Sequence, residues 1–167
     1  MRSGDLVKGA VAGAAAGLLA SFVMNQFQTA WSTAEKQISP GEGDDDGDGE
    51  DPATVKAADQ AARAATGRPL PEEAKAPAGQ VVHYTTGAVL GAVYGALAEV
   101  FPTITAGFGS AYGTLVNLVL DEGLVPALGL GPSPFKTPFK TPAYGAASHS
   151  VFGVALELGR RAARNAL

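Results

Sequence analysis

The residues of this chain that could do chemistry are two histidines and two adjacent carboxylates, His83, Asp121, Glu122 and His149, set in otherwise apolar sequence. Imidazole and carboxylate groups together can bind Zn, Mn or Fe. They could also relay protons, because ionisable side chains in membrane segments are costly and mark ion pathways. A structural interpretation competes with both, since the carboxylates could cap a helix and each histidine could form an interhelical hydrogen bond. We favour the structural interpretation and keep a metal or proton site as the alternative.

A second set of polar residues lies within or at the ends of the same apolar segments. Its members are Asn25, Glu99, Asn117, Glu157, Arg160 and Arg161. We expect both glutamates near one membrane surface, within reach of Arg160 or Arg161. Salt bridges of this kind are ordinary at an interface and contribute little to stability. They therefore inform us about architecture more than about activity.

The sequence lacks the motifs of common enzyme classes. It has no cysteine, which excludes disulfides, thiolate metal sites and cysteine nucleophiles. It also has no Walker loop, GxSxG, HExxH or dinucleotide-binding glycine motif. A membrane enzyme built on the histidines and carboxylates ranks last among the hypotheses, because no nucleophile can be named. We predict that the protein is not an enzyme and has no cofactor, with a divalent metal kept as the alternative.

Small residues recur at every fourth position on four segments and share those stripes with the polar groups. The stripes are Gly9, Gly13, Gly17, Ser21 and Asn25; His83, Gly87, Gly91, Gly95 and Glu99; Gly109, Gly113, Asn117 and Asp121; and Gly145, His149, Gly153 and Glu157. In a water-soluble helix each interior glycine costs about 1 kcal/mol relative to alanine. In lipid the same stripes let helices approach closely and pack. The pattern predicts membrane-spanning helices whose polar groups lie on packed faces.

The distribution of charge divides the chain into apolar spans. Residues 9–34, 76–98 and 100–120 contain no Asp, Glu, Lys or Arg, and each can cross a hydrocarbon core of about 30 Å. A fourth interval, 141–156, needs Leu158 and the stems of nearby arginines to complete a crossing. We predict an all-α, four-span transmembrane helical bundle with a long acidic extramembrane linker and one short surface helix. The alternative is a soluble or peripheral helical protein, since alanine and glycine dilute the hydropathy.

The predicted organisation is a first span in residues 1–34, an acidic linker with a short helix in 35–75, and a three-span core in 76–167. The spans are expected over residues 6–27, 81–101, 104–120 and 142–158. The first apolar run resembles a secretory signal, but it continues to Trp31 and is treated as a span. A tight turn at Pro102 should make the second and third spans an antiparallel hairpin.

The linker is the most charged part of the chain, because residues 35–75 hold 16 of its 28 charged side chains. The run 41–51 has no apolar side chain to bury, which is typical of a flexible linker. Residues 44–49 match the first half of an EF-hand calcium loop, but the twelfth position is Val55 instead of a bidentate glutamate. We favour a solvated linker over a calcium site.

Residues 52–66 are predicted to form the short surface helix. Asp51 could act as its N-cap, a proline occupies the first turn, and Gly67 follows the last helical residue. Asp59 and Arg63 have the spacing of a supporting ion pair. The apolar face is mostly alanine, so this helix would not anchor strongly in a membrane.

The segment 121–141 is rich in glycine and proline and repeats Pro-Phe-Lys-Thr over 134–137 and 138–141. The regular phenylalanines and lysines suggest an extended strap at the membrane interface, with rings pointing inward and ammonium groups in water. An ordinary polar loop is equally compatible with the sequence.

The basic residues suggest an orientation. An even number of spans puts both termini on one side of the membrane. That side would carry Arg2, Lys8, Arg160, Arg161 and Arg164. The positive-inside rule then predicts that both termini of this multi-pass protein are cytoplasmic.

Three runs of the sequence resemble the YagU-like family of bacterial inner-membrane proteins. The runs are residues 83–102, which end in Ala-Glu-Val-Phe-Pro, residues 128–134 and residues 149–161. The resemblance covers residues 80–164 and implies a multi-span inner-membrane protein with no established biochemical activity. The matching polar positions are His83, Glu99, His149, Glu157, Arg160 and Arg161. The acidic linker and the repeated tetrapeptide look like local additions, and Asp121 and Glu122 match less clearly.

The sequence thus predicts an integral protein of the bacterial inner (plasma) membrane with a structural or accessory role. The alternative function is a small proton or divalent-metal transporter or channel component that uses His83, His149 and Asp121 or Glu122. The expected partner is the lipid bilayer, together with a second copy or another membrane protein. No nucleic-acid partner is expected.

Overall fold

The computed structural model describes residues 3–38 and 51–166, and within these ranges the chain is helical with no strand. The α-helices are α1 (Ser3–Ile38), α2 (Ala53–Thr66), α3 (Glu72–Val100), α4 (Ser110–Val116), α5 (Val125–Ala127) and α6 (Lys140–Ala166). The other helical segments are the 3-10 helices η1 (Pro102–Gly109) and η3 (Pro134–Lys136) and the π-helix η2 (Asn117–Leu124). The all-α prediction is confirmed for the described residues, whereas residues 44–49, which resemble a calcium loop, lie outside them.

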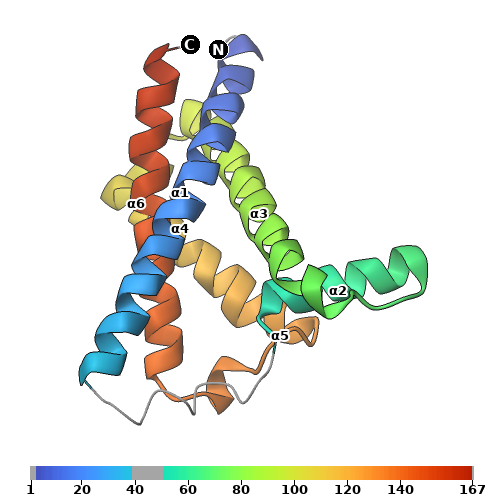
Figure 1. The fold of residues 1–167 in the computed structure, drawn as a ribbon. Helices are drawn as coiled ribbons and strands as arrows, with labels where there is room; N and C mark the ends of the chain where they lie inside the picture. The colour runs from blue at the N-terminus through green and yellow to red at the C-terminus, as the bar shows by residue number, and fades with distance from the viewer. Residues whose placement is uncertain (1–2, 39–50, 167) are drawn as a thin grey trace.

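The long helices form a bundle in which α1 is central. It packs against both α3 and α6, and α4 also packs against α6. The first described turn of α1 and the last turn of α6 lie at the same end of the bundle (Figure 1). The short helix α2 packs against α3 and lies near the opposite end (Figure 1).

The small-residue stripes of α1 and α3 meet backbone to backbone. A Cβ atom on Gly13 would overlap the carbonyl oxygen of Gly91, and one on Gly17 would overlap that of Gly87. Any side chain at these positions would force the helices apart. This contact offsets the helical cost of glycine, about 1 kcal/mol for each residue.

The stripes of α4 and α6 meet in the same way. A Cβ atom on Gly113 would overlap the carbonyl oxygen of His149, and one on Gly109 would overlap that of Gly153. Gly109 also has a φ of 86°, a left-handed conformation that favours glycine. The prediction of close packing through the stripes is therefore correct. The sequence did not indicate which stripes would pair. In the structure α1 pairs with α3, and α4 pairs with α6.

The connection between α3 and α4 differs from the tight turn predicted at Pro102. The helix ends before Phe101, and the reversal is completed only by Gly107, Phe108 and Gly109, all with positive φ angles (61°, 55° and 86°). Because the reversal takes this many residues, α3 and α4 do not pack closely as a hairpin. Each helix instead pairs with α1 or α6.

Two tyrosines connect the two helix pairs at the centre of the bundle. The rings of Tyr94 and Tyr112 lie 4.7 Å apart, and the Tyr112 hydroxyl donates a hydrogen bond to the carbonyl oxygen of Leu90 at 2.9 Å. Phe152 and Leu156 of α6 complete this core with the buried alanines of α1. Burial of each large side chain contributes about 1.5–3 kcal/mol.

The helix that follows the reversal is longer than the predicted span 104–120. From α4 through η2 to α5 the backbone stays helical, because the joining residues Asn117 and Val125 keep right-handed helical angles. Asp121 and Glu122 therefore lie inside the helix, in its π-helical part, and the prediction that they cap its end is wrong. Widened π-helical turns are frequent at functional sites.

The short helix α2 is close to its prediction, with one difference at its start. Gly67 ends it in a left-handed conformation, and Arg63 pairs with Asp59 at 2.7 Å. The predicted N-cap is wrong: Pro52 occupies the cap position, and no side chain caps the helix. The Asp51 carboxylate instead contacts Lys75 of α3 at 2.9 Å.

The repeated Pro-Phe-Lys-Thr segment is also less extended than predicted. It forms the short helix η3 and then the first residues of α6. Its two aromatic rings point outward, with Phe135 97% and Phe139 85% exposed. Lys140 at the start of α6 pairs with Glu35 near the end of α1.

Among the described residues, three helical segments are long and apolar enough to cross a membrane. They are Asp5–Ile38, Glu72–Val100 and Pro102–Ala127. The predicted fourth span, now α6, does not reach the same hydropathy, because serine, histidine, glutamate and arginine interrupt its apolar residues.

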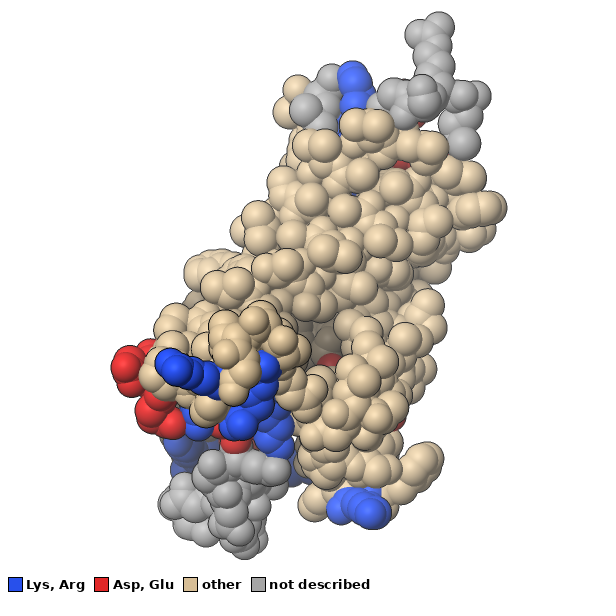
Figure 2. Space-filling view, turned by 90° about the vertical axis from the view of Figure 1, so that its right-hand side faces the viewer, with Lys and Arg blue, Asp and Glu red and all other residues tan. Residues whose placement is uncertain are grey.

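Many large apolar side chains are exposed on the outside of the bundle. Examples are Val11, Leu18, Phe22, Val89, Val93, Leu115, Leu118 and Val119. On the face drawn in Figure 2, the charged side chains gather toward the ends and the broad part above the middle is uncharged. A surface of this kind suits a lipid environment better than water.

Candidate functional site

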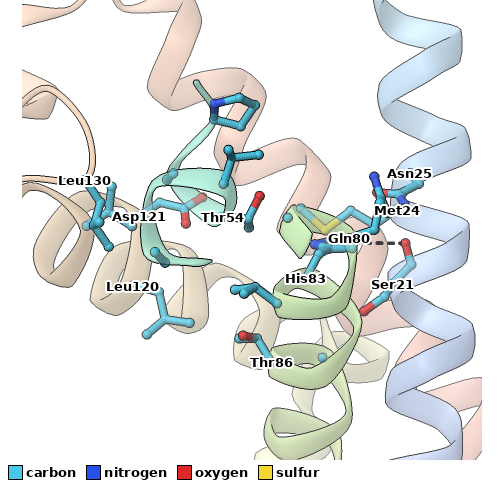
Figure 3. A pocket seen from close by; sticks show the side chains of 18 of the residues that line it. Ser21, Met24, Asn25, Thr54, Gln80, His83, Thr86, Leu120, Asp121 and Leu130 are labelled. Atoms are coloured by element: carbon cyan, nitrogen blue, oxygen red, sulfur yellow. Dashed lines mark hydrogen bonds between the residues drawn. The ribbon is translucent and has the colours of Figure 1, made fainter. Parts of the chain in front are cut away.

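A cavity of about 710 Å³ lies between the helices at the end of the bundle where α2 packs. Its walls come from α1, α2, α3, the continuous α4–α5 helix and α6 (Figure 3). The volume falls in the range of about 300–1,000 Å³ that is usual for small-molecule sites. This is the candidate functional site.

This cavity is lined by three of the four residues predicted from the sequence as a metal or proton site, namely His83, Asp121 and His149. They come from α3, η2 and α6, so the fold gathers residues far apart in the sequence. Glu122, the fourth, is not part of the lining. In Figure 3, His83 and Asp121 belong to different walls of the cavity.

Asp121 and His149 are close to each other. The Asp121 Oδ2 atom lies 3.5 Å from His149 Nδ1 and accepts a hydrogen bond from the Asn117 side-chain amide at 3.3 Å. The same His149 nitrogen lies 3.0 Å from the carbonyl oxygen of Gly145, its more favourable partner by distance. No lysine or arginine of the described residues pairs with Asp121, whose side chain is 44% exposed.

His83 has a separate partner across the α1–α3 interface. Its Nε2 atom lies 3.3 Å from the carbonyl oxygen of Ser21 (Figure 3). Ser21 itself is 1% exposed, and its hydroxyl has no hydrogen-bond partner among the residues that the structure describes. Within residues 3–38 and 51–166, no three histidine, aspartate or glutamate side chains lie close enough together to hold a metal ion. The predicted four-ligand set is thus divided between separate contacts.

The polar rim of the cavity carries more carboxylates than cations. Asp51, Glu72 and Asp121 line it together with a single ammonium, that of Lys75. Lys75 contacts both Asp51, at 2.9 Å, and Glu72, at 2.8 Å. Among the described residues Asp121 has no lysine or arginine partner, so the lining is negative when both histidines are neutral.

A second polar cluster surrounds Glu157 near the end of the bundle where α1 begins and α6 ends. The Glu157 carboxylate is fully buried, and it accepts hydrogen bonds from the Tyr94 hydroxyl at 2.9 Å and from Arg160 Nε at 2.7 Å. Arg160 donates a second bond at 3.0 Å, and Arg161 donates one at 2.6 Å. With four donors the carboxylate is saturated, so this cluster is not the exposed interfacial salt bridge that the sequence suggested.

Glu99 pairs with a different arginine from the two expected. Its carboxylate contacts Arg164 Nε at 2.9 Å, and Arg164 also approaches Asp5 at 3.6 Å. These contacts tie the last turn of α6 to α1 and α3. Arg161 also lies over the ring of Phe108, 5.2 Å from its centroid.

The two asparagines of the predicted polar set have structural partners. Asn25 donates to the Gln80 side-chain oxygen at 3.3 Å and to the Tyr84 hydroxyl at 3.5 Å, which joins α1 to α3. Asn117 is 1% exposed and donates to Asp121. Both lie at the cavity end of the small-residue stripes.

Sequence reasoning missed Tyr94, whose hydroxyl completes the Glu157 cluster. A signal was present, because a tyrosine inside an apolar span needs a hydrogen-bond partner. It also missed the pairing of Lys75 with Asp51, since nothing in the spacing brings α3 back to the start of α2.

Comparison with known proteins identifies a family but no activity. No curated protein and no solved structure matches the chain. The family model described as "Protein of unknown function (DUF1440)" matches residues 69–158, more than half of the chain. This range holds most of the motifs that resemble the YagU-like family, although that name and a bacterial origin remain predictions. The chain belongs to the DUF1440 family of proteins of unknown function.

Proposed function

We propose that this protein is an integral membrane protein that crosses the bilayer four times and has a structural or accessory role, without enzymatic activity. The proposal rests on the backbone contact between glycine stripes, such as Gly13 against Gly91 and Gly113 against His149. Such stripes weaken helices in water and favour helix association in lipid. The large apolar side chains exposed on the outside support the same environment.

The packing of α6 supports its assignment as the fourth span. Its 27 residues are about 40 Å long, enough to cross the hydrocarbon core. Its polar residues face other helices: Glu157 is fully buried, and His149 is mostly covered. A helix whose polar groups are satisfied by its neighbours can be buried in a membrane at lower hydropathy than an isolated span.

The proposed orientation follows from the basic residues at one end of the bundle. Arg160, Arg161 and Arg164 of α6 lie at the end where α1 begins. By the positive-inside rule this end would face the cytoplasm, and in a bacterium the membrane would be the inner membrane. The turn at Gly67 and the residues around Thr137 would then lie on the outer side.

The topology can be tested with single cysteines, because the natural chain has none. Three variants suffice: Arg68→Cys, Thr137→Cys and Asn165→Cys. A membrane-impermeant maleimide added to intact spheroplasts should label the first two. It should label Asn165→Cys only after the membrane is permeabilised.

Two results would contradict the proposal in different ways. Labelling of Thr137→Cys and Asn165→Cys from the same side would remove α6 as a span. Labelling of all three in a protein recovered without detergent would remove the membrane assignment itself. The cysteine-free parent serves as the control for background labelling.

A second candidate function is a small transporter or channel component for protons or a divalent metal. The observation that favours it is the cavity lined by His83, Asp121 and His149. Ionisable residues at membrane depth are costly and mark such pathways. The absence of a three-ligand group in residues 3–38 and 51–166 makes protons the better supported of the two ions.

Liposome measurements separate this candidate from the structural role. Purified protein should carry proton or metal flux above the level of empty liposomes, and His83→Ala or His149→Ala should abolish it. Flux at background for the natural chain would reject transport. Elemental analysis of the same sample tests for bound metal.

The proposed partner is the lipid bilayer. The glycine stripes that could have joined two copies are already occupied within one chain, at the α1–α3 and α4–α6 contacts. An oligomer would therefore have to use other faces of the bundle. No nucleic-acid partner is proposed.

A further inference from the structure

We infer that the cavity between the helices binds a lipophilic organic cation, whose charge lies beside Asp121 and whose apolar body packs against the cavity floor. This inference goes beyond the proposed structural role and does not depend on ion transport. It rests on the shape of the cavity, the charge of its lining and two polar groups without full partners.

The apolar floor favours a ligand with a large apolar body. Leu90, Val116 and Phe152 line the cavity and also belong to, or pack against, the central core. Leu120 and Leu130 add further apolar surface near Asp121 (Figure 3). A hydrated metal ion or a proton would leave this surface without a partner, whereas a bulky organic group would bury it.

The charge of the lining favours a cation over an anion. Its three carboxylates face one ammonium, and that ammonium is held between Asp51 and Glu72. Asp121, whose side chain is 44% exposed, therefore offers a negative charge beside the apolar floor. A partly buried charge attracts an opposite charge more strongly than a fully solvated one does.

The local structure around Asp121 directs its carboxylate toward the cavity. The residue lies in the π-helical part of the helix, and Asn117 holds one of its carboxylate oxygens at 3.3 Å. In Figure 3 its side chain extends from the helix toward the interior of the cavity. Glu122, the next residue, is not part of the lining and so provides a matched control.

The Ser21 hydroxyl supports a ligand in this cavity independently of Asp121. Its side chain is 1% exposed and lines the cavity, and its hydroxyl has no partner among the described residues. A buried hydroxyl without a partner is unfavourable, so it is usually satisfied by a ligand or by water. A ligand that extends from Asp121 across the cavity and carries a polar substituent at the far end would supply that partner.

Binding can be measured with two ions of similar size and opposite charge. Tetraphenylphosphonium is a lipophilic cation, and tetraphenylborate is the corresponding anion. Equilibrium dialysis with the full chain in lipid nanodiscs, corrected with empty nanodiscs, removes partitioning into lipid. We expect saturable binding of the cation and none of the anion.

Three variants test whether Asp121 is the residue that binds the cation. Asp121→Asn keeps the shape and the hydrogen-bonding capacity but removes the charge, and it should weaken cation binding about tenfold or more. Glu122→Gln removes a neighbouring charge of the same sign and should leave the affinity unchanged. Thr86→Trp should block the cavity and abolish binding whatever the state of Asp121.

Several outcomes would overturn the inference. The natural chain could bind neither ion or both equally, or Asp121→Asn and Glu122→Gln could have the same effect. If Asp121→Asn does not fold, Thr86→Trp decides, since unchanged binding in that variant rejects the cavity as the site. None of these results alters the cysteine-labelling pattern, so the failure of this inference and the failure of the proposed topology are distinguishable.

Discussion

Glu157 and Asp121 both carry a carboxylate, but different groups surround the two. Glu157 is fully buried and receives hydrogen bonds from Tyr94, Arg160 and Arg161. Asp121 is partly exposed to a cavity, and its polar contacts among the described residues are with Asn117 and His149. The first arrangement holds helices together, and the second leaves a charge available for a ligand.

The first prediction concerns the buried cluster. Glu157→Gln should destabilise the protein by about 3–5 kcal/mol, because it leaves Arg160, whose side chain is only 12% exposed, without its counter-charge. Tyr94→Phe removes a single hydrogen bond to the same carboxylate and should cost less, about 1.5–3 kcal/mol. Thermal unfolding in detergent, followed by circular dichroism, measures both. Equal losses in the two variants would show that charge pairing is not what stabilises this cluster.

At the residue scale the sequence predicted which groups are chemically unusual but not how they pair. His83, Asp121 and His149 were identified from residue type and do line one cavity. Glu99 was expected to reach Arg160 or Arg161 and instead contacts Arg164. A helix period fixes the face on which a residue lies, whereas the choice among three nearby arginines depends on the rotation and height of the neighbouring helix.

The helices themselves are defined by their small-residue stripes. The α1–α3 and α4–α6 pairs both depend on glycine at the contact, because carbonyl oxygens occupy the space of a Cβ atom. The sequence predicted this close approach correctly. It could not predict which pairs form, since every stripe is compatible with every other.

The second prediction tests one such contact. Gly91→Ala adds a single methyl group against the carbonyl oxygen of Gly13 and should destabilise the bundle by about 1–3 kcal/mol. Val93→Ala on the same helix alters a side chain that is 47% exposed, and it should be close to neutral. Thermal unfolding in the same detergent compares the two. A neutral Gly91→Ala would mean that α1 and α3 are not in backbone contact.

The third prediction concerns the turn between α2 and α3. The pKa of Asp59 lies below its usual value because Arg63 donates a hydrogen bond to the carboxylate and the Leu70 amide donates another. A lowered pKa stabilises the turn above the pKa of the unfolded chain, about 4, and this stabilisation is lost as the pH falls further. Asp59→Asn should remove the dependence.

Hydrogen exchange at the Leu70 amide, corrected for intrinsic rates, follows this effect. In the natural chain protection should fall on acidification, and in Asp59→Asn it should be low throughout. Protection that does not change with pH in the natural chain would exclude Asp59 as the group that holds the turn.

The ends of two helices show why the sequence predicted some helix boundaries correctly and others incorrectly. Gly67 ended α2 as expected, because a left-handed glycine is a local signal. The helix through Asp121 continued to Ala127 despite Gly123, because its flanking residues keep helical angles in the π-helical turn. The difference arises from tertiary packing, which the local sequence does not record.

The whole molecule has two different ends joined by an apolar middle. One end carries the cavity with its excess of carboxylates, and the other carries the arginines around Glu157 and Glu99. Tyr94 and Tyr112 connect the two helix pairs between them. This polarity along the bundle axis is what the proposed membrane orientation requires.

The central claim is that hydrocarbon surrounds the middle of the bundle, and spin labels test it most directly. Nitroxides attached to Val89→Cys and Leu118→Cys, whose natural side chains are 58% and 57% exposed, would be compared with one at Ala65→Cys on α2. In lipid nanodiscs, molecular oxygen should reach the first two readily and a water-soluble nickel complex should not, whereas the label on α2 should meet the nickel complex freely. Equal collision of the nickel complex with all three labels would contradict the account.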